Sequence, residues 1–203
     1  AACWLDLRTV WPHVDVLTLS AHKFGGPKGV GIMAVREGVE LEPLIFGGGQ
    51  ERDRRSGTHN VAGIVGAATA LYVTDVTRAE EVARLGALRD QLIAGLVNGI
   101  HCAVPTLQPG IGVAGTAHVC LEGLESESLL YLLDGAGVCV SAASACASGA
   151  MEPSHVLSAM GFSKDRIKGS LRFSLGHTTT EADITAAFNS TVAAAQRLQA
   201  VKQ

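Results

Sequence analysis

A run of helix-breaking residues between two apolar segments constrains this chain more than any other feature. Residues 14–19 are largely apolar and predict a buried strand that ends at Ser20, and residues 29–35 predict the next strand. The connection contains four residues that interrupt helices: Gly25, Gly26, Pro27 and Gly29. We therefore expect a non-helical loop. Because glycine lets a backbone approach a ligand closely, the loop is interpreted as a ligand surface presenting Ser20, His22 and Lys23.

Lys23 is the residue of this loop with the most distinctive chemistry. Apolar residues on either side would remove water from its ammonium group and favour the neutral amine, which is the form that attacks an aldehyde to give a Schiff base. The alternative is that Lys23 is an ordinary surface lysine in a glycine-rich turn, which would show the same spacing of lysine and glycine residues. The residues alone leave both interpretations open.

Composition narrows the class of protein. The 203 residues are 47% hydrophobic and 17% charged, which indicates a globular protein with a substantial core. The formal net charge of −3 gives no electrostatic reason to expect nucleic acid or a membrane surface as partner. The five cysteines include no Cys-x-x-Cys pair, so neither a zinc site nor a disulfide framework is expected. Reduced thiols predict a cytoplasmic protein.

The predicted elements alternate between strands and helices. Residues 1–36 are expected to be strand-rich, residues 60–75 to form a buried helix, residues 78–96 to form an amphipathic helix with a leucine stripe, and residues 98–115 to be loop. Strands are predicted at 117–122, 138–141 and 170–175, and helices at 126–134, at 153–160 and after Thr180. This order indicates an α/β or α+β fold, with domains at 1–77 and 78–203.

Two further segments contain reactive or charged groups. Nearly every residue in 141–150 is tiny, so we expect a flexible loop that presents the thiol of Cys146. The other cysteines are interpreted as small buried hydrophobic residues: Cys3, Cys102, Cys120 and Cys139. Arg172 lies on the polar face of the predicted strand 170–175, where its guanidinium group could bind a carboxylate through two hydrogen bonds or form a structural ion pair.

Three motifs together resemble one enzyme family. The sequence Ser-Ala-His-Lys-Phe-Gly-Gly-Pro-Lys-Gly at 20–29 closely resembles the cofactor-lysine motif of the cysteine desulfurases, which are class V members of the fold type I enzymes that use pyridoxal 5′-phosphate (PLP). Ser-Ala-Cys at 144–146, followed by Glu-Pro-Ser at 152–154, is similar to the catalytic loop of the NifS- and IscS-like group. Ser-Leu-Arg-Phe-Ser-Leu-Gly at 170–176 is similar to the substrate-binding strand, although His177 stands where arginine is common.

The resemblance implies a role for each matching residue in the lysine motif. Lys23 would bind PLP and act as a catalytic base, while Ser20 and His22 would bind the cofactor phosphate. Thr58 matches the threonine of an Arg-Ser-Gly-Thr loop that, in the family, crosses the dimer interface to the phosphate of the partner subunit. Taken without the family, residues 44–58 would be interpreted as a mobile, solvated basic turn.

The remaining matches imply the reaction. Cys146 would take sulfur from L-cysteine, giving L-alanine and a persulfide, and Arg172 would hold the substrate carboxylate. The persulfide would pass to an acceptor protein for iron–sulfur cluster assembly or tRNA thiolation. The family further implies a homodimer. From the residues themselves we expect no metal site, no membrane span and no direct contact with nucleic acid.

The resemblance also implies that this chain is a part of an enzyme. Ala1 aligns just after the family's Asp-x-x-Gln segment, so residues 1–77 would be the C-terminal part of the PLP-binding large domain and 78–203 the small domain. We expect the isolated chain to bind PLP weakly or not at all. Two alternatives stay open: an inactive fragment acting as a docking module, and a related class V enzyme such as a selenocysteine lyase or an aminotransferase.

Overall fold

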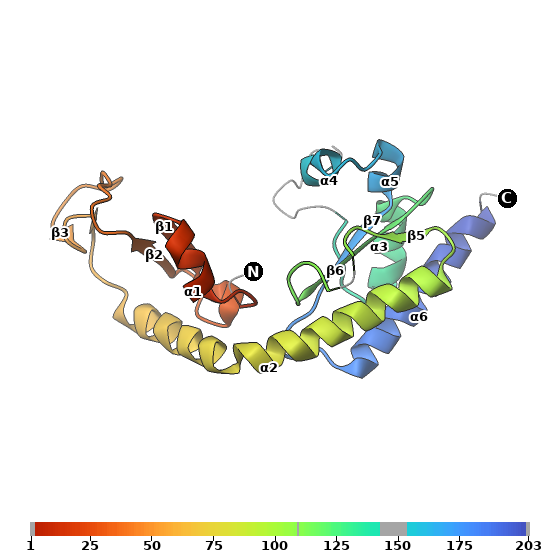
Figure 1. Ribbon diagram of the computed structural model, residues 1–203, viewed down its shortest axis with the longest axis horizontal. Helices are drawn as coiled ribbons and strands as arrows, with labels where there is room; N and C mark the ends of the chain where they lie inside the picture. The colour runs from red at the N-terminus through yellow and green to blue at the C-terminus, as the bar shows by residue number, and fades with distance from the viewer. Residues whose placement is uncertain (1–2, 109, 143–153, 202–203) are drawn as a thin grey trace. The chain divides into compact units, whose positions relative to one another are not determined.

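The computed structural model describes residues 3–108, 110–142 and 154–201 (Figure 1). The chain separates into two compact units, Ala1–Glu80 and Glu81–Gln203. The change of unit falls within the long helix α2 (Val61–Gly99), so residues 61–80 of this helix belong to the first unit and residues 81–99 to the second. No helix among the described residues is both long enough and apolar enough to cross a membrane.

The first unit is built around an antiparallel pair of strands, β1 (Val16–Ser20) and β2 (Gly31–Val35). Val16 pairs with Val35 and Ser20 with Gly31, which confirms the two predicted strands. Each strand begins two residues later than predicted. A second, short pair, β3 (Gly49–Gln50) and β4 (Arg55–Ser56), precedes α2. The strands position the connection that contains Lys23.

The expectation that residues 1–36 are strand-rich is wrong for the segment before β1. This segment forms a short helix α1 (Leu7–Val10) and a 3-10 turn η1 (Trp11–His13). The Asp6 side chain accepts a hydrogen bond from the backbone N–H of Arg8 and so caps α1, and Pro12 occupies the first turn of η1. Both residues favour helix starts, and these local signals outweigh the apolar pattern.

A single helix replaces the two helices predicted at 60–75 and 78–96. Residues 75–78 contain neither glycine nor proline, and Arg78 forms an ion pair of 2.8 Å with Asp75 one turn earlier. Such a pair at i,i+3 stabilises a helix across the predicted break. In the second unit the leucine stripe is confirmed, because four of its members are fully or almost fully buried: Leu85, Leu88, Leu92 and Leu96.

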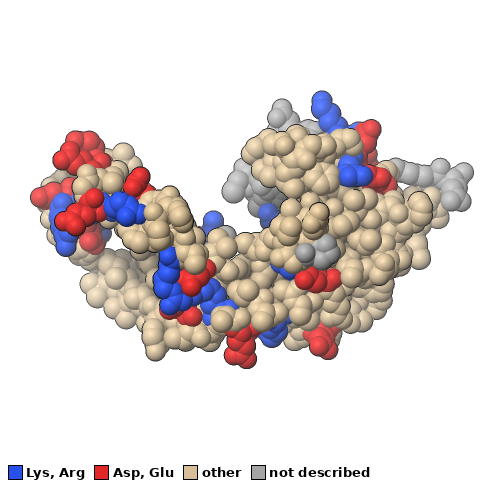
Figure 2. All heavy atoms as spheres, viewed as in Figure 1, with Lys and Arg blue, Asp and Glu red and all other residues tan. Residues whose placement is uncertain are grey.

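The first part of α2 is not the buried helix that its composition predicted. Gly63, Ala67 and Thr74 are buried, whereas many apolar side chains between them face solvent. Val61 is 66% exposed and Tyr72 is 69% exposed. Figure 2 shows uncharged atoms over the start of this helix. The small core of the first unit lies under its other side, where Cys3, Ala21, Phe24 and Ala67 pack with Trp4, Leu19, Val30, Ile32, Ala70 and Leu71.

The second unit is a three-stranded antiparallel sheet covered by helices. Its strands are β5 (Ala103–Pro105), β6 (Thr116–Leu121) and β7 (Ser170–Ser174), in the order β5-β6-β7. Its helices besides α2 are α3 (Ser126–Gly135), α4 (His155–Ala159), α5 (Lys164–Lys168) and α6 (Glu181–Val201). α3 packs against α6. The core side chains of the sheet include Ala117, Val119, Leu171 and Phe173.

Three expectations for the second unit differ from the structure. β5 lies inside the predicted loop 98–115, where its pairing with β6 outweighs the local glycines and prolines. Residues 138–141 are not a regular strand and contribute one bridge, between Ser141 and Arg172. Helix α5 was not predicted. Its N-terminal cap is Ser163, whose hydroxyl accepts a hydrogen bond from the backbone N–H of Arg166, and serine before a helix is a signal that the sequence offered. By contrast, the predicted cap of α6 is confirmed, because Thr180 and Asp183 exchange side chain–backbone hydrogen bonds of 2.8 and 3.3 Å.

Candidate active site

The segment that contains Lys23 begins directly where β1 ends. Residues Ala21–Phe24 form a 3-10 turn, η2, so the prediction that this connection is wholly non-helical is wrong for four residues. The turn stops at Gly25, whose φ of 86° is a left-handed conformation that glycine adopts without steric cost. The Ala21 N–H donates to the carbonyl oxygen of Val30 at 3.0 Å, and this bond closes the connection onto the start of β2.

Two buried side chains fix the inner side of the turn. The Cys3 thiol donates a hydrogen bond of 2.8 Å to the backbone carbonyl of Lys23, and the Thr74 hydroxyl donates one of 3.3 Å to that of Phe24. Cys3 is 6% exposed and Thr74 is 5% exposed, so both donor side chains are shielded from water. Sequence reasoning treated Cys3 only as a small buried residue, and no local pattern marks Thr74. Both act on a segment far away in the chain.

The outer side of the turn presents the predicted cofactor-binding residues together. His22 and Lys23 are exposed and Ser20 is half-buried. None of these three side chains forms a hydrogen bond or ion pair with another described residue. The exposure of Lys23 also means that the described chain does not supply the apolar enclosure that the sequence predicted. A primary amine, a hydroxyl and an imidazole on one hydrogen-bonded turn fit an aldehyde cofactor that carries a phosphate group.

Thr58 lies in a different part of the first unit, after the hairpin of β3 and β4. Its side chain is exposed, and its carbonyl oxygen accepts a hydrogen bond of 3.5 Å from Arg55. The same guanidinium group donates to the carbonyls of Ser56 and Gly57, both at 2.7 Å from Nη2. Arg55 therefore holds the backbone of the Arg-Ser-Gly-Thr segment in a defined shape and leaves the Thr58 hydroxyl free to face another molecule.

Arg172 lies at the centre of β7 in the second unit. Its Cα is paired with that of His118 on β6, so the two side chains project from the same face of the sheet. Arg172 Nε and His118 Nδ1 are both buried and have no hydrogen-bond partner among the described residues. The pKa of His118 falls to about 4, chiefly because burial disfavours the charged ring and secondarily because of the positive charge of Arg172.

His118 is a functional candidate that sequence reasoning missed. Its neighbours in β6, Ala117 and Val119, are fully buried on one face of the sheet, and His118 lies on the opposite face because side chains alternate along a strand. This alternation was available in the sequence as a signal. The pairing of His118 with Arg172 depends on the register between two strands that are more than fifty residues apart.

Cys146 lies outside the described residues, but the segment leading toward it is placed. The Ser141 N–H donates to the carbonyl of Arg172 at 3.1 Å, and the Arg172 N–H donates back to that of Ser141 at 2.8 Å. In addition, the Ser170 hydroxyl donates to the carbonyl of Ala142 at 3.0 Å. The chain therefore leaves the sheet beside Arg172, immediately before the segment of tiny residues.

The other cysteines are free thiols, and most follow the prediction. Cys3 and Cys120 are buried and Cys102 is half-buried. Burial raises the pKa of Cys120 to about 11, which makes its thiol a poor nucleophile. Cys139 is exposed, so its interpretation as a buried hydrophobic residue is wrong. It follows α3 in the segment that forms a single bridge instead of the predicted strand, and this leaves one side of the segment open to solvent.

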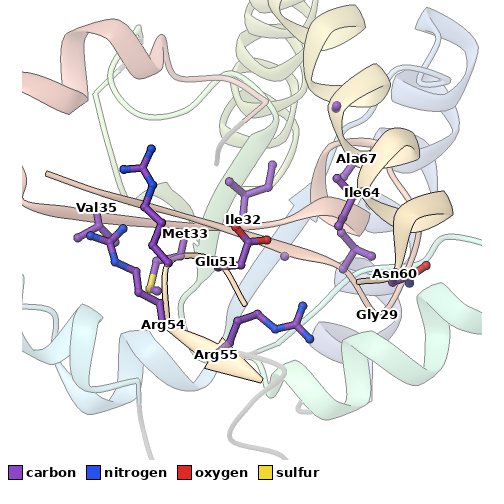
Figure 3. A pocket seen from close by; sticks show the side chains of 14 residues that line it. Gly29, Ile32, Met33, Val35, Glu51, Arg54, Arg55, Asn60, Ile64 and Ala67 are labelled. Carbon is purple, nitrogen blue, oxygen red and sulfur yellow. The ribbon is translucent and has the colours of Figure 1, made fainter. Parts of the chain in front are cut away.

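A hollow of about 690 Å³ in the first unit is separate from the predicted site (Figure 3). It lies between β2, the turn before β4 and the start of α2. Figure 3 shows apolar side chains such as Ile32 and Ile64 together with the guanidinium groups of Arg54 and Arg55 around it. None of the predicted catalytic or cofactor-binding residues lines this hollow, so its size alone does not identify the site.

The glycine-rich lysine turn and the strand containing Arg172 occur in the order of one known family. Residues 9–187 match the family model described as aminotransferase class V. The chain belongs to this family. Its match covers both structural units and includes the segments that contain Lys23, Thr58, Cys146 and Arg172.

Relatives within the class V family carry consistent names. An IscS-like cysteine desulfurase of Mycobacterium tuberculosis is 47% identical over 176 residues, which are 86% of this chain and 44% of that protein. A solved structure named NifS-like protein has a TM-score of 0.81 at 38% identity and covers 92% of this chain and 47% of its own. A solved structure of SspA in complex with cysteine has a TM-score of 0.61 at 29% identity, and the match covers 86% of this chain and 48% of the SspA chain. The chain thus spans about half the length of the relatives that it matches, and its fold is part of the fold type I architecture.

Proposed function

We propose that this chain is the part of a PLP-dependent cysteine desulfurase that provides the cofactor lysine, the sulfur-accepting thiol and the substrate-carboxylate site. The observation that carries the proposal is the double hydrogen bond between Ser141 and Arg172. It joins the strand of the carboxylate-binding residue to the segment that precedes Cys146. Five residues of extended chain span at most about 18 Å, so covalent connection keeps Cys146 within that reach of Ser141.

The first unit supplies the cofactor-binding residues. When bound, PLP supplies an electron sink for the substrate α-carbon. Lys23 would hold the cofactor aldehyde through its Nζ atom, and Ser20 and His22 would bind the phosphate beside the same turn. Thr58 would bind the phosphate of the cofactor in a partner subunit. Arg55 holds the loop of Thr58 in shape through hydrogen bonds to the carbonyls of Ser56 and Gly57. The Nζ of Lys23 would also take a proton from the substrate α-carbon and return one later in the reaction.

The second unit supplies the groups that act on the substrate. Arg172 orients L-cysteine through its carboxylate. The thiolate of Cys146 attacks the substrate sulfur, the C–S bond breaks, and its electron pair stays with the carbon fragment. That fragment gains a proton and leaves as L-alanine, while the sulfur remains on Cys146 as a persulfide. The solved structure of the relative SspA, which is a complex with cysteine, supports L-cysteine as the substrate.

The proposal extends to the organisation of the enzyme. Residues 1–77 would belong to the large PLP-binding domain and residues 78–203 to the small domain, a division close to the observed change of unit after Glu80. The persulfide would pass to an acceptor protein in the cytoplasm, for iron–sulfur cluster assembly or tRNA thiolation. The name of the M. tuberculosis relative, an IscS-like cysteine desulfurase, supports release of sulfur from cysteine as the reaction that feeds this transfer.

Exposed apolar side chains support a homodimer. Leu44, Ile45 and Phe46 are 96%, 70% and 79% exposed. They precede the loop of Thr58, and the Ser56 hydroxyl donates to the carbonyl of Ile45 at 3.0 Å, so the two segments are connected. An apolar surface of this kind is typical of protein interfaces. A second copy that covers it would bring Thr58 toward the cofactor of the other subunit.

The test uses a chimera in which this chain replaces the matching segment of the M. tuberculosis relative. With PLP and L-cysteine, we expect alanine in the product and one added sulfur atom on Cys146 by mass spectrometry. Lys23→Ala should abolish the visible absorption of bound cofactor. Cys146→Ser should keep that absorption but form no protein persulfide, which separates cofactor binding from sulfur transfer.

The alternatives give different outcomes in the same experiment. An aminotransferase would convert alanine to pyruvate without needing Cys146, and a selenocysteine lyase would release selenide from selenocysteine in preference to sulfur from cysteine. A docking module would show no cofactor absorption even in the chimera. Sulfur transfer that survives Cys146→Ser would refute the proposed role of this thiol.

A further inference from the structure

The face of the β6–β7 pair that contains Arg172 has polar side chains at every paired position except Cys120. Three cross-strand pairs lie on it: Thr116 with Ser174, His118 with Arg172, and Cys120 with Ser170. The intervening residues face the other way and form the core of the second unit, as the full burial of Ala117, Val119 and Leu171 shows. The sheet therefore separates an apolar, helix-covered side from a strip of side chains that can form hydrogen bonds.

The central pair of this strip contains two buried atoms that have no hydrogen-bond partner within the described ranges 3–108, 110–142 and 154–201. They are Arg172 Nε and His118 Nδ1. Buried polar atoms are nearly always hydrogen-bonded, so two in adjacent positions require an explanation. The two atoms also do not satisfy each other, although an N–H of arginine could donate to an unprotonated ring nitrogen. Both are therefore available to a third group on the same face.

The chemistry of the two side chains identifies that third group. Arginine has donors and no acceptor, and the ring of His118 is neutral at pH 7 because its pKa is about 4. A neutral imidazole has one N–H donor and adds no second positive charge. A carboxylate has two oxygen atoms that can accept from a guanidinium group and from an imidazole N–H at the same time. Such an anion would satisfy both buried atoms.

We propose that His118 is a second substrate-binding residue, whose Nδ1–H donates a hydrogen bond to the carboxylate that Arg172 binds. This inference rests on the proposed function, which places the substrate carboxylate at Arg172. It adds a residue of the neighbouring strand to the site and assigns the Nδ1–H tautomer to the bound state. His118 fixes the orientation of the carboxylate plane, since the two donors come from different strands at a fixed register.

The experiment follows both side chains by NMR in the 203-residue chain, with acetate as the probe. Nitrogen-15 labelling of histidine and arginine reports His118 Nδ1 and Arg172 Nε separately. Acetate should shift both resonances with a single dissociation constant, and the His118 signal should move to the position of a protonated Nδ1. His118→Phe should weaken acetate binding about tenfold, the value for loss of one hydrogen bond to a charged group.

Matched variants separate a binding role from a structural one. His118→Asn keeps an N–H near the position of Nδ1 and should bind acetate within about twofold of the unmodified chain, since the donor is retained. Arg172→Gln should abolish binding. Ser174→Ala, on the same polar face, should leave the dissociation constant unchanged.

Other outcomes overturn one idea or both. If acetate shifts Arg172 but not His118, and His118→Phe binds as well as the unmodified chain, the role of His118 is refuted and Arg172 keeps its proposed role. If neither resonance responds at saturating acetate, the carboxylate site itself is refuted. If acetate binds as expected but the chimera transfers no sulfur, the proposed reaction fails while the two-residue site stands.

Discussion

Acidification should selectively destabilise the second unit through His118. In the folded chain the pKa of this residue is lowered from 6.5 to about 4, because burial and the charge of Arg172 disfavour the protonated ring. Between these two values the unfolded chain binds a proton that the folded chain does not. The free energy of unfolding must therefore decrease as the pH falls through this interval, and it must be insensitive to His118 above pH 6.5.

The size of the effect follows from the same interval. Each pH unit over which one proton binds only to the unfolded state lowers the free energy of unfolding by about 1.4 kcal/mol. From pH 6.5 down to about pH 4 the loss attributable to His118 is about 3 kcal/mol. This is a large fraction of the roughly 5–15 kcal/mol that is typical of a folded domain.

The assay is urea denaturation at a series of pH values, read by hydrogen exchange of peptides that contain β6 and β7. This readout is needed because Trp4 and Trp11, the two tryptophans of the chain, lie in the first unit. The control is His118→Asn, which does not titrate, so that subtracting its curve removes the contribution of the carboxylates. Parallel curves for the two proteins between about pH 4 and 6.5 would refute the reasoning.

Three other predictions concern stability. Thr74→Val removes the buried donor to the Phe24 carbonyl and should lower the free energy of unfolding by roughly 1–3 kcal/mol, measured by tryptophan fluorescence. The control Thr69→Val, on the exposed face of the same helix, should lower it by less than about 0.5 kcal/mol. Equal effects would contradict the conclusion that Thr74 holds the lysine turn in place. Gly26→Ala adds a methyl group 3.0 Å from the side chain and the carbonyl oxygen of Ala21 and should cost about 1–3 kcal/mol in the same assay; an unchanged free energy of unfolding would contradict the close packing at this position. Leu133→Ala should cost about 2–5 kcal/mol in the second unit, while a comparable loss in Tyr131→Ala, where the side chain is 82% exposed, would count against this packing.

Local patterns in the sequence were sufficient for much of the fold. The two strands around the lysine turn, the leucine stripe of α2, the cap at Thr180 and the alternation of β7 were all predicted and confirmed. The class V family and the fold type I architecture followed from three motifs. The roles of Lys23, Cys146 and Arg172 in the reaction stay predictions, as does the role of Thr58 toward a partner subunit.

Composition and spacing, taken by themselves, determined which residues can do chemistry and which short segments form strands or helices, because these properties depend on neighbours along the chain. Tertiary structure alone decided that Cys3 and Thr74 hold the lysine turn and that His118 lies beside Arg172. Each of these facts is a contact between distant segments or the result of one. Strand register and helix packing fix such contacts in space, and no local periodicity encodes them.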